Sequence, residues 1–234
     1  MSCLCQEIAG PDIELAPVCI GNHWIFQNLA PEDVEALSLE ALRKKTAKGD
    51  SLFLQGDPAD DMFLIKGGRI KLSKVLEDGT EIMLDIRKAG DFVGENMFSE
   101  EGVYPVSAIC LEDTLTCGFS RKQFEEMVLQ HPKVGLQIIK TLSERISNLT
   151  DRVGSLAVAN IEDRLYRVLS NVAREHGTQS PKGVVIQFPL THEDLGFLTG
   201  AHRVSITRAM KTLKETGKII LEGRHLILPT LNIA

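Results

Sequence analysis

The segment near the end of the chain, residues 190–208 of 234, constrains the fold more than any other. Thr191 is a good N-cap, and Asp194 three residues later completes a capping box, so a helix begins here. Gly200 interrupts the apolar run, which predicts a tight turn before a second helix. A helix, a short glycine turn and a helix form a motif whose second helix fits the major groove of DNA.

The second predicted helix has two faces. Its buried face is predicted from the apolar residues spaced at i, i+4 and i+7, which are Ile206, Met210 and Leu213. Val204, Ser205 and Arg208 therefore lie on the opposite side, which is open to solvent. We expect these three residues to contact double-stranded DNA.

Two short apolar segments around Gly223, within residues 218–228, predict a final hairpin. A hairpin after a helix-turn-helix is a wing, which rests near the phosphate backbone in proteins of this architecture. Lys218 and Arg224 are placed to touch that backbone, and we count Thr191 with them among the DNA-contacting residues.

Short strands separated by glycine turns are predicted between residues 42 and 118. Glycine recurs there at Gly49, Gly56, Gly67, Gly68, Gly79, Gly90 and Gly94. Asp78-Gly79 is a hairpin signal, and residues 70–75 alternate apolar and polar side chains over their first four positions. Turns at this spacing favour a compact β-barrel or roll.

Helices follow the roll. Ser120 is a candidate cap for a short helix through Val128, and Pro132 opens a long helix that continues to about Val158. Apolar residues of the long helix are spaced three, four, three, four and three apart, at Ile139, Leu142, Ile146, Leu149, Val153 and Leu156. This spacing is typical of a coiled-coil seam and favours a homodimer, the alternative being a helix packed on its own roll.

Asn160 is the next N-cap, and it opens a helix that ends near Gly177. A domain boundary is therefore predicted just before Asn160. We expect a cysteine-containing segment (1–24), the roll as sensor (25–130), a dimerisation helix with hinge (131–159) and the DNA-binding domain (160–234).

The order of these parts resembles the CRP/FNR family of bacterial transcription regulators over nearly the whole chain. Residues 90–95 look like the family's roll motif, residues 152–157 like the end of its long helix, and residues 200–208 like its recognition helix. The resemblance implies an α+β fold with an N-terminal β-roll (a jelly-roll-like double-stranded β-helix), a long dimerisation helix and a C-terminal winged helix-turn-helix. It also implies a dimeric regulator bound to a near-palindromic operator, with RNA polymerase as a partner if it is an activator.

The family's DNA contacts carry over residue by residue. Arg208 matches the arginine that reads a guanine edge, Arg203 a position used for phosphate or base contact, and Ser205 one used for phosphate. Val204 departs from the pattern, because many members have a glutamate there that accepts from a cytosine amino group. A valine offers only an apolar surface suited to a thymine methyl, so we expect an A/T-rich half-site at that step.

The effector pocket implied by the resemblance comprises Gly94, Glu95 and Ser107 of the roll with Leu149 and Thr150 of the long helix. Members that bind cyclic AMP hold its phosphate with an arginine and a serine after the glutamate-containing motif. Residues 98–108 contain no arginine. A buried phosphate would lack a cationic partner, which argues against cyclic AMP as the effector.

The cysteines suggest a different signal, redox or gas. Oxygen-sensing members hold an iron-sulfur cluster with three N-terminal cysteines and one in the roll, and Cys3, Cys5, Cys19 and Cys117 supply that number with a different spacing. Zinc, a redox-sensitive disulfide, and no role beyond packing are the alternatives. A haem is the other sensing hypothesis, for which His23 is the histidine considered.

Composition and charge bear on the function class. From Val158 onward ten Lys and Arg stand against seven Asp and Glu, a net charge of +3. The rest of the chain has a net charge of −9, which gives the total of −6. The electropositive end agrees with a DNA-binding domain. No histidine occurs between residues 25 and 130, and no phosphate-loop or nucleophile-elbow sequence is present, which argues against an enzyme. The alternative function is a regulatory small-molecule-binding module of the cyclic-nucleotide-binding type without direct gene regulation.

The first residues lack the pattern of a signal peptide, and the chain has no apolar run long enough to span a bilayer. We therefore expect a cytoplasmic protein without membrane contact.

Overall fold

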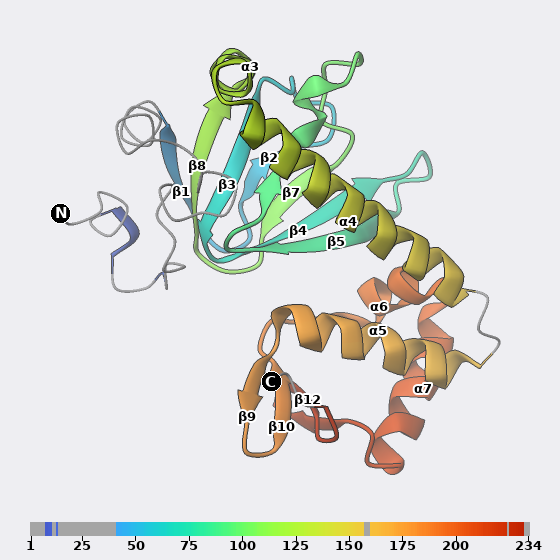
Figure 1. Ribbon diagram of the computed structural model, residues 1–234. Helices are drawn as coiled ribbons and strands as arrows, with labels where there is room; N and C mark the ends of the chain where they lie inside the picture. Colours follow the sequence, from blue (N-terminus) through green and yellow to red (C-terminus); the bar gives the residue numbers. More distant parts are fainter. Residues whose placement is uncertain (1–7, 11–12, 14–40, 157–159, 224, 232–234) are drawn as a thin grey trace. The chain divides into compact units, whose positions relative to one another are not determined.

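The computed structural model describes residues 8–10, 13, 41–156, 160–223 and 225–231. These residues form two compact units, and the division between the units falls within helix α4 (Pro132–Leu156), between residues 145 and 146. Figure 1 shows a roll of strands followed by helices and a second, mainly helical part with a small sheet. The predicted α+β fold is confirmed.

The described part of the first unit contains two four-stranded antiparallel sheets. One has the strand order β1-β8-β3-β6 and the other β2-β7-β4-β5. The strands are β1 (Leu42–Thr46), β2 (Ser51–Phe53), β3 (Asp61–Gly67), β4 (Arg69–Val75), β5 (Glu81–Lys88), β6 (Phe92–Val93), β7 (Ser107–Cys110) and β8 (Thr114–Ser120). Strands that are neighbours in a sheet are mostly distant in sequence, which is the pattern of a roll and not of a simple meander.

One apolar cluster contains residues of both sheets. Its fully buried members include Leu64, Ile65, Ile70, Leu115 and Phe119. Phe53 and Tyr104 stack within it, with ring centroids 3.8 Å apart. These side chains bind the two sheets together, because burial of apolar surface stabilises the packed arrangement by about 25 cal/mol per Å².

Glycines mark the strand ends as predicted. Gly79, at φ 83°, lies in the hairpin between β4 and β5, where Val75 pairs with Glu81. Gly68, at φ 90°, lies between β3 and β4. Both have the left-handed backbone that L side chains rarely adopt. The hairpin predicted from Asp78-Gly79 is therefore confirmed.

The alternation of apolar and polar residues over 70–73 is matched by burial only as far as Leu72. The pairing of β4 with β5 changes from Leu72–Asp85 to Ser73–Met83, so β5 contains one more residue than β4 at this bulge. Leu72 and Ser73 are both buried, and Lys74 and Val75 are both exposed. The burial of β4 therefore does not alternate beyond Leu72.

Three helical segments complete the described part of the roll and lead out of it. They are the 3-10 helix η2 (Glu95–Phe98), α3 (Arg121–Gln130) and α4. Ser120 caps α3 through a capping box with Gln123, as predicted, and α3 continues two residues beyond Val128. The long helix opens at Pro132 as predicted and is described as far as Leu156. Among the described residues no helix is apolar over a length that would cross a membrane.

The second unit continues from α4 into three helices and one small sheet. The elements after α4 are α5 (Ile161–His176), β9 (Thr178–Ser180), β10 (Gly183–Ile186), α6 (His192–Thr199), α7 (Arg203–Glu215), β11 (Ile220–Glu222) and β12 (His225–Leu228). The sheet has the order β11-β12-β10-β9. Asn160 caps α5 by accepting from the Asp163 N–H at 3.1 Å, and the helix stops at Gly177, as predicted.

The hairpin of β9 and β10 was missed by the sequence analysis. Its strongest signal is the run Val184-Val185-Ile186, which is short and lies directly after Gly183. Val184 pairs with Gln179 of β9 and also with Leu228 of β12, a partner more than forty residues away in the sequence. Local periodicity therefore had little to detect.

Substitution of Gly68 provides a test of the roll. Gly68→Ala is expected to destabilise it by about 1 to 3 kcal/mol more than Gly79→Ala, because an added Cβ at residue 68 would lie 2.7 Å from the Asp113 carbonyl oxygen. Gly79 has a similar φ, but nothing lies within 4 Å of its Cβ position, so it is the matched control for backbone strain alone. Urea-unfolding midpoints of the two variants compare them, and equal midpoints would contradict the expectation.

Candidate nucleic-acid interface

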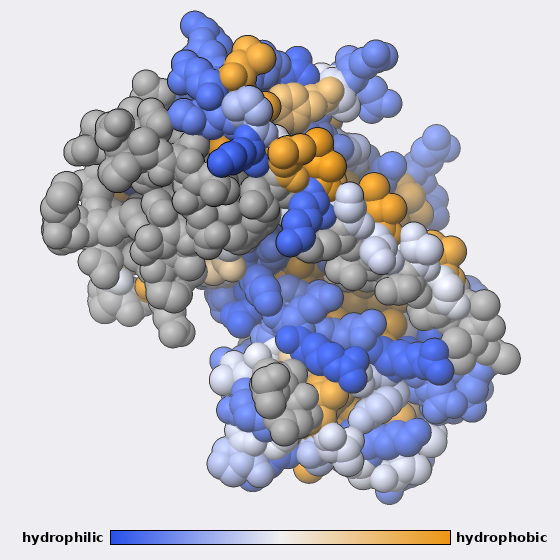
Figure 2. Space-filling model, in the orientation of Figure 1, coloured by the Kyte–Doolittle hydropathy of each residue, from blue (hydrophilic) through white to orange (hydrophobic). Residues whose placement is uncertain are grey.

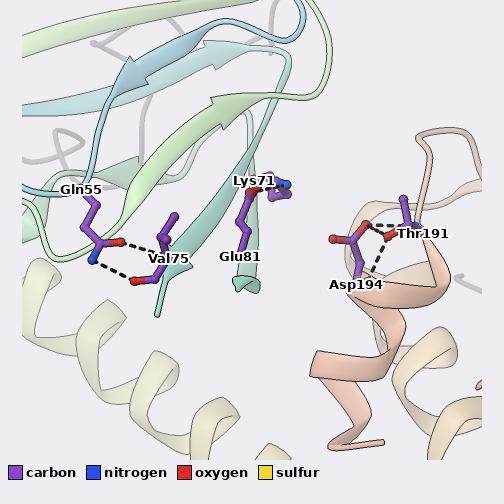
Figure 3. A network of polar contacts seen from close by, with 6 residues as sticks. All are labelled: Gln55, Lys71, Val75, Glu81, Thr191 and Asp194. Carbon is purple, nitrogen blue, oxygen red and sulfur yellow. Dashed lines mark hydrogen bonds and ion pairs between the residues drawn. The ribbon is translucent and has the colours of Figure 1, made fainter. Parts of the chain in front are cut away.

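A capping box fixes the start of α6. The Thr191 Oγ1 accepts from the Asp194 N–H at 3.0 Å and donates to the Asp194 Oδ2 at 2.7 Å. The same carboxylate oxygen accepts from the Thr191 N–H at 2.9 Å (Figure 3). The predicted capping box is confirmed, and it uses the hydroxyl proton of Thr191 within the cap.

Two glycines shape the turn between α6 and α7. Gly200 ends α6 with φ 62° and ψ 40°, the left-handed conformation expected of a glycine cap. Gly196 allows close approach, because a Cβ there would lie 2.7 Å from the Ala201 carbonyl oxygen. The Ala201 N–H also donates to the Gly196 carbonyl at 2.8 Å. The predicted helix, glycine turn and helix are therefore present.

The two faces of α7 are as predicted. Ile206, Met210 and Leu213 are buried, with 0%, 6% and 1% exposure. Val204 is 63% exposed and Arg208 is exposed, while Ser205 is half-buried. The side of α7 opposite the core is therefore available to a ligand.

The exposed side of α7 is basic. We call Arg203, Val204, Thr207, Arg208 and Lys211 the outer face of α7, since all five are exposed. Lys211 lies 3.8 Å from Glu215, one turn later. Within the described part of the chain, neither the Arg203 nor the Arg208 guanidinium has an ion-pair partner, so both are available to an anion or to a base edge.

The sequence analysis missed a contact between α6 and the outer face of α7. The His192 Nδ1 lies 2.9 Å from the Thr207 Oγ1, and this hydroxyl also donates to the Arg203 carbonyl at 3.0 Å. His192 directly follows the N-cap Thr191, and its spacing from Thr207 corresponds to no local motif. No sequence signal would have found it.

The predicted wing hairpin is present as β11 and β12, with Gly223 at φ 61° between them. Lys218 precedes the hairpin, lies 3.5 Å from Asp163 of α5 and has its ammonium 5.5 Å from the centre of the Tyr166 ring. These contacts place Lys218 against α5. Its predicted phosphate contact is not tested, and Arg224 lies outside the described residues.

The apolar seam predicted on α4 is exposed in the single chain. Ile139, Ile146 and Val153 are 60%, 65% and 68% exposed, and Leu142 and Leu149 are exposed as well. Figure 2 shows apolar side chains at the surface along the course of α4. The side chain of Leu156 lies outside the described residues. Exposure of this kind over several turns leaves the seam without a cover in the monomer.

In the roll, the predicted pocket residues have partners in the protein. The Glu95 carboxylate lies 3.5 Å from the Arg87 guanidinium, which is also 3.2 Å from Asp85. Ser107 is buried, and its Oγ accepts from the Gln55 N–H at 3.0 Å. The sequence analysis missed Arg87, because it lies on β5, ahead of the motif in which an arginine was sought.

The Gln55 side chain extends the sheet beyond β7. Its Oε1 accepts from the Val75 N–H at 2.8 Å, and its Nε2 donates to the Val75 carbonyl at 3.2 Å (Figure 3). The amide thereby imitates a neighbouring strand at the end of β4.

The other three predicted pocket residues lie in different elements. Gly94, at φ 92°, directly precedes η2 in the roll. Leu149 and Thr150 lie on α4 in the second unit, where the Thr150 hydroxyl donates to the Ile146 carbonyl at 2.9 Å.

Cys110 and Cys117 are buried in strands β7 and β8, with 1% and 0% exposure. Burial raises the pKa of the Cys110 thiol, which keeps it protonated and unreactive near neutral pH. Among the residues that the structure describes, no group of three or more His, Cys, Asp or Glu is placed to hold a metal. Cys3, Cys5, Cys19 and His23 lie outside the described residues, so the cluster and haem hypotheses remain untested.

Two protein families match the two units. The family described as the cyclic nucleotide-binding domain matches residues 43–131, and the Crp-like helix-turn-helix domain matches residues 163–232. Together they span the roll and the helix-turn-helix, in the order of the CRP/FNR regulators. The chain belongs to the CRP/FNR family.

Curated relatives of this CRP/FNR protein are named as regulators, some of them as transcriptional regulators. A CRP-like cAMP-activated global transcriptional regulator of Mycobacterium tuberculosis is 24% identical over 204 residues, which cover 87% of this chain and 91% of the relative. An anaerobic regulatory protein of Bacillus subtilis is 28% identical over 216 residues, covering 85% and 91%. This CRP/FNR chain is accordingly a DNA-binding transcription regulator.

Solved structures agree on the fold. The c-di-GMP responsive global regulator CLP of Xanthomonas campestris superposes with a TM-score of 0.73 at 21% identity, covering 86% of this chain and all of that one. A CooA mutant of Carboxydothermus hydrogenoformans gives a TM-score of 0.68 at 21% identity, covering 94% of each chain.

Proposed function

We propose that this CRP/FNR regulator binds DNA as a homodimer, with the outer face of α7 in the major groove and the N-terminal unit as the sensor. The observation that carries the proposal is the pair of exposed guanidiniums, Arg203 and Arg208, on a helix whose opposite side is buried. In this proposal residues 1–24 and 25–130 sense the signal, 131–159 dimerise and 160–234 bind DNA.

Arg208 is assigned to base reading. A guanidinium makes paired hydrogen bonds to O6 and N7 of guanine, and Arg208 lies on the exposed side of α7 without an ion pair to a described residue. Arg203, at the first turn of α7, is assigned to phosphate or base contact and Ser205 to phosphate. Thr191, Lys218 and Arg224 are assigned to the flanking backbone, where the capping contacts of Thr191 make its part mainly one of positioning α6.

Val204 sets the preference at one step of the half-site. Its side chain is 63% exposed and has no hydrogen-bonding group, so it can contact a thymine methyl but cannot accept from a cytosine amino group. The half-site is therefore A/T-rich at that step.

The seam of α4 is assigned to the dimer interface. An amphipathic helix with five seam residues exposed in the monomer requires a cover, and a second copy of the same seam provides one by symmetry. A two-fold dimer presents two α7 helices, which read two half-sites related by the same axis, hence a near-palindromic operator.

The signal is assigned to an effector or to redox or gas chemistry in the N-terminal unit, and not to cyclic AMP. Among the relatives one is named as cAMP-activated and another as an anaerobic regulatory protein. Residues 98–108 of this chain lack an arginine, and Glu95 is engaged by Arg87. The absorption spectrum of protein purified without oxygen distinguishes an iron-sulfur cluster, a haem and neither.

Substitution of Arg208 tests the reading helix. Arg208→Ala is expected to weaken binding to a duplex selected by the wild-type protein by about 1 to 3 kcal/mol, because the paired bonds to guanine are lost. Electrophoretic retardation at fixed salt measures the affinity. Arg174→Ala removes an equal charge from the surface of α5 and is the control, so equal losses in the two variants would count against base reading by Arg208.

Selection of binding sequences from a random duplex pool tests the assignment of Val204. Wild-type protein is expected to enrich A/T at the step opposite residue 204, and Val204→Glu is expected to change that step to cytosine while the rest of the site stays the same. Enrichment of cytosine by the wild-type protein would refute the assignment.

A charge in the seam tests the dimer. Ile146→Asp is expected to give monomers in sedimentation equilibrium and to weaken operator binding, because it places carboxylates in a symmetric apolar interface. Leu129→Asp alters an apolar residue of α3 that is 80% exposed and off the seam, and it should leave the dimer intact. A dimeric Ile146→Asp protein would exclude this seam as the interface.

A further inference from the structure

The contact between His192 and Thr207 fixes which ring nitrogen carries the proton. The Thr207 hydroxyl has a single proton, and it lies 3.0 Å from the Arg203 carbonyl, which can only accept. The hydroxyl therefore donates to this carbonyl and uses a lone pair toward the His192 Nδ1, 2.9 Å away. In the neutral ring Nδ1 then carries the hydrogen, and Nε2 is left as an acceptor.

His192 lies at the border of the outer face of α7. Its partner Thr207 is a member of that face, one turn after Arg203 and next to Arg208. Its backbone is fixed by the Thr191–Asp194 capping box, which directly precedes it and begins α6. In the proposed complex with DNA held by Arg203 and Arg208, we place a phosphate of the duplex at this border.

We propose that His192 is a further DNA-backbone ligand of this regulator and binds a phosphate oxygen through Nε2 only as the imidazolium, so that DNA binding takes up a proton. The inference rests on the proposed contact between the outer face of α7 and DNA. Phosphate oxygens only accept hydrogen bonds. A neutral ring with its hydrogen on Nδ1 has only a lone pair at Nε2, so it cannot donate to a phosphate oxygen there. Protonation adds a donor at Nε2 and a positive charge without breaking the Thr207 contact.

Charged residues lie on α6 and on the two helices that pack against it, α5 and α7. Glu193 and Asp194 lie on α6 itself, and Arg203, Arg208 and Lys211 lie on the outer face of α7. The helix α5, which also packs against α6, carries the titratable residues Glu162, Asp163, Arg164, Tyr166, Arg167, Arg174, Glu175 and His176. Asp163 is near Lys218, and His176 is buried edge-on against the Phe188 ring. The phosphate of bound DNA adds the negative charge that favours the imidazolium on the outer face.

The sign of the pH dependence follows. DNA phosphates do not change charge between about pH 5 and 8, whereas histidine does. Binding that takes up a proton at His192 becomes tighter as the pH falls through this interval. The share due to this residue is the difference between the wild type and variants of His192, in which every other titratable group is kept.

The experiment measures affinity for the selected duplex from about pH 8 to about pH 6, with the salt dependence at each end. Wild-type affinity is expected to rise by up to about tenfold more than that of His192→Ala, and its salt slope to steepen by about 0.9 at the lower pH, as for one added phosphate contact. The amide of His192→Gln donates at any pH, so the affinity of this variant for the duplex should change little as the pH is lowered. His131→Gln, in the first unit, should behave as wild type.

Thr207→Val tests whether the Thr207 hydroxyl is what places the ring hydrogen of His192 on Nδ1. Without the hydroxyl, the neutral ring is free to carry its hydrogen on Nε2 and donate to phosphate, so the His192-dependent part of the pH profile should shrink. Identical pH profiles and salt slopes for wild type and His192→Ala would overturn the inference while leaving DNA binding in place. Failure of the wild-type protein to bind any duplex at any pH would overturn the proposed α7 contact and this inference with it.

Discussion

The close approach of α6 to the turn before α7 is the constraint on which the DNA-binding unit depends. A Cβ at Gly196 would lie 2.7 Å from the Ala201 carbonyl, so only glycine allows this separation, and Gly200 supplies the left-handed residue that turns the chain. With the turn fixed, α7 can bury Ile206 and Leu213 only in one rotation about its axis. Its basic outer face is the consequence, because the residues between the buried ones have no other direction to point.

Elements with local causes were predictable from the sequence. Ser120, Asn160 and Thr191 each begin a helix through a side chain that accepts a backbone N–H three residues later, and each was identified from the sequence as an N-cap. The turn at Gly79 and the periodicity of α7 are local in the same sense. The signal and the structure it specifies lie within the same few residues, so little depends on the rest of the fold.

Features with distant causes were not predictable. The strand β10 pairs with the distant β12 as well as with its neighbour β9, and the bulge opposite Ser73 lies in β5, where that strand meets β4. The same limit applies to the candidate site. The partner of Glu95 comes from β5 and that of His192 from a different helix, and neither spacing forms a motif. Candidate residues were therefore found where a family pattern or an amphipathic face named them, while their partners came only from the three-dimensional structure.

The charge balance in the roll bears on which ligands it can admit. Arg87 is half-buried, with a side chain 13% exposed, and it faces two carboxylates, Asp85 at 3.2 Å and Glu95 at 3.5 Å. These three groups together are net negative. A cyclic phosphate entering beside Glu95 would have to compete with both carboxylates for one guanidinium, and it would add a further negative charge at low dielectric. A ligand without phosphate would not compete for the Arg87 guanidinium, and neither would a signal received elsewhere in the N-terminal unit. The ion pairs of Arg87 with Asp85 and Glu95 would then remain in place.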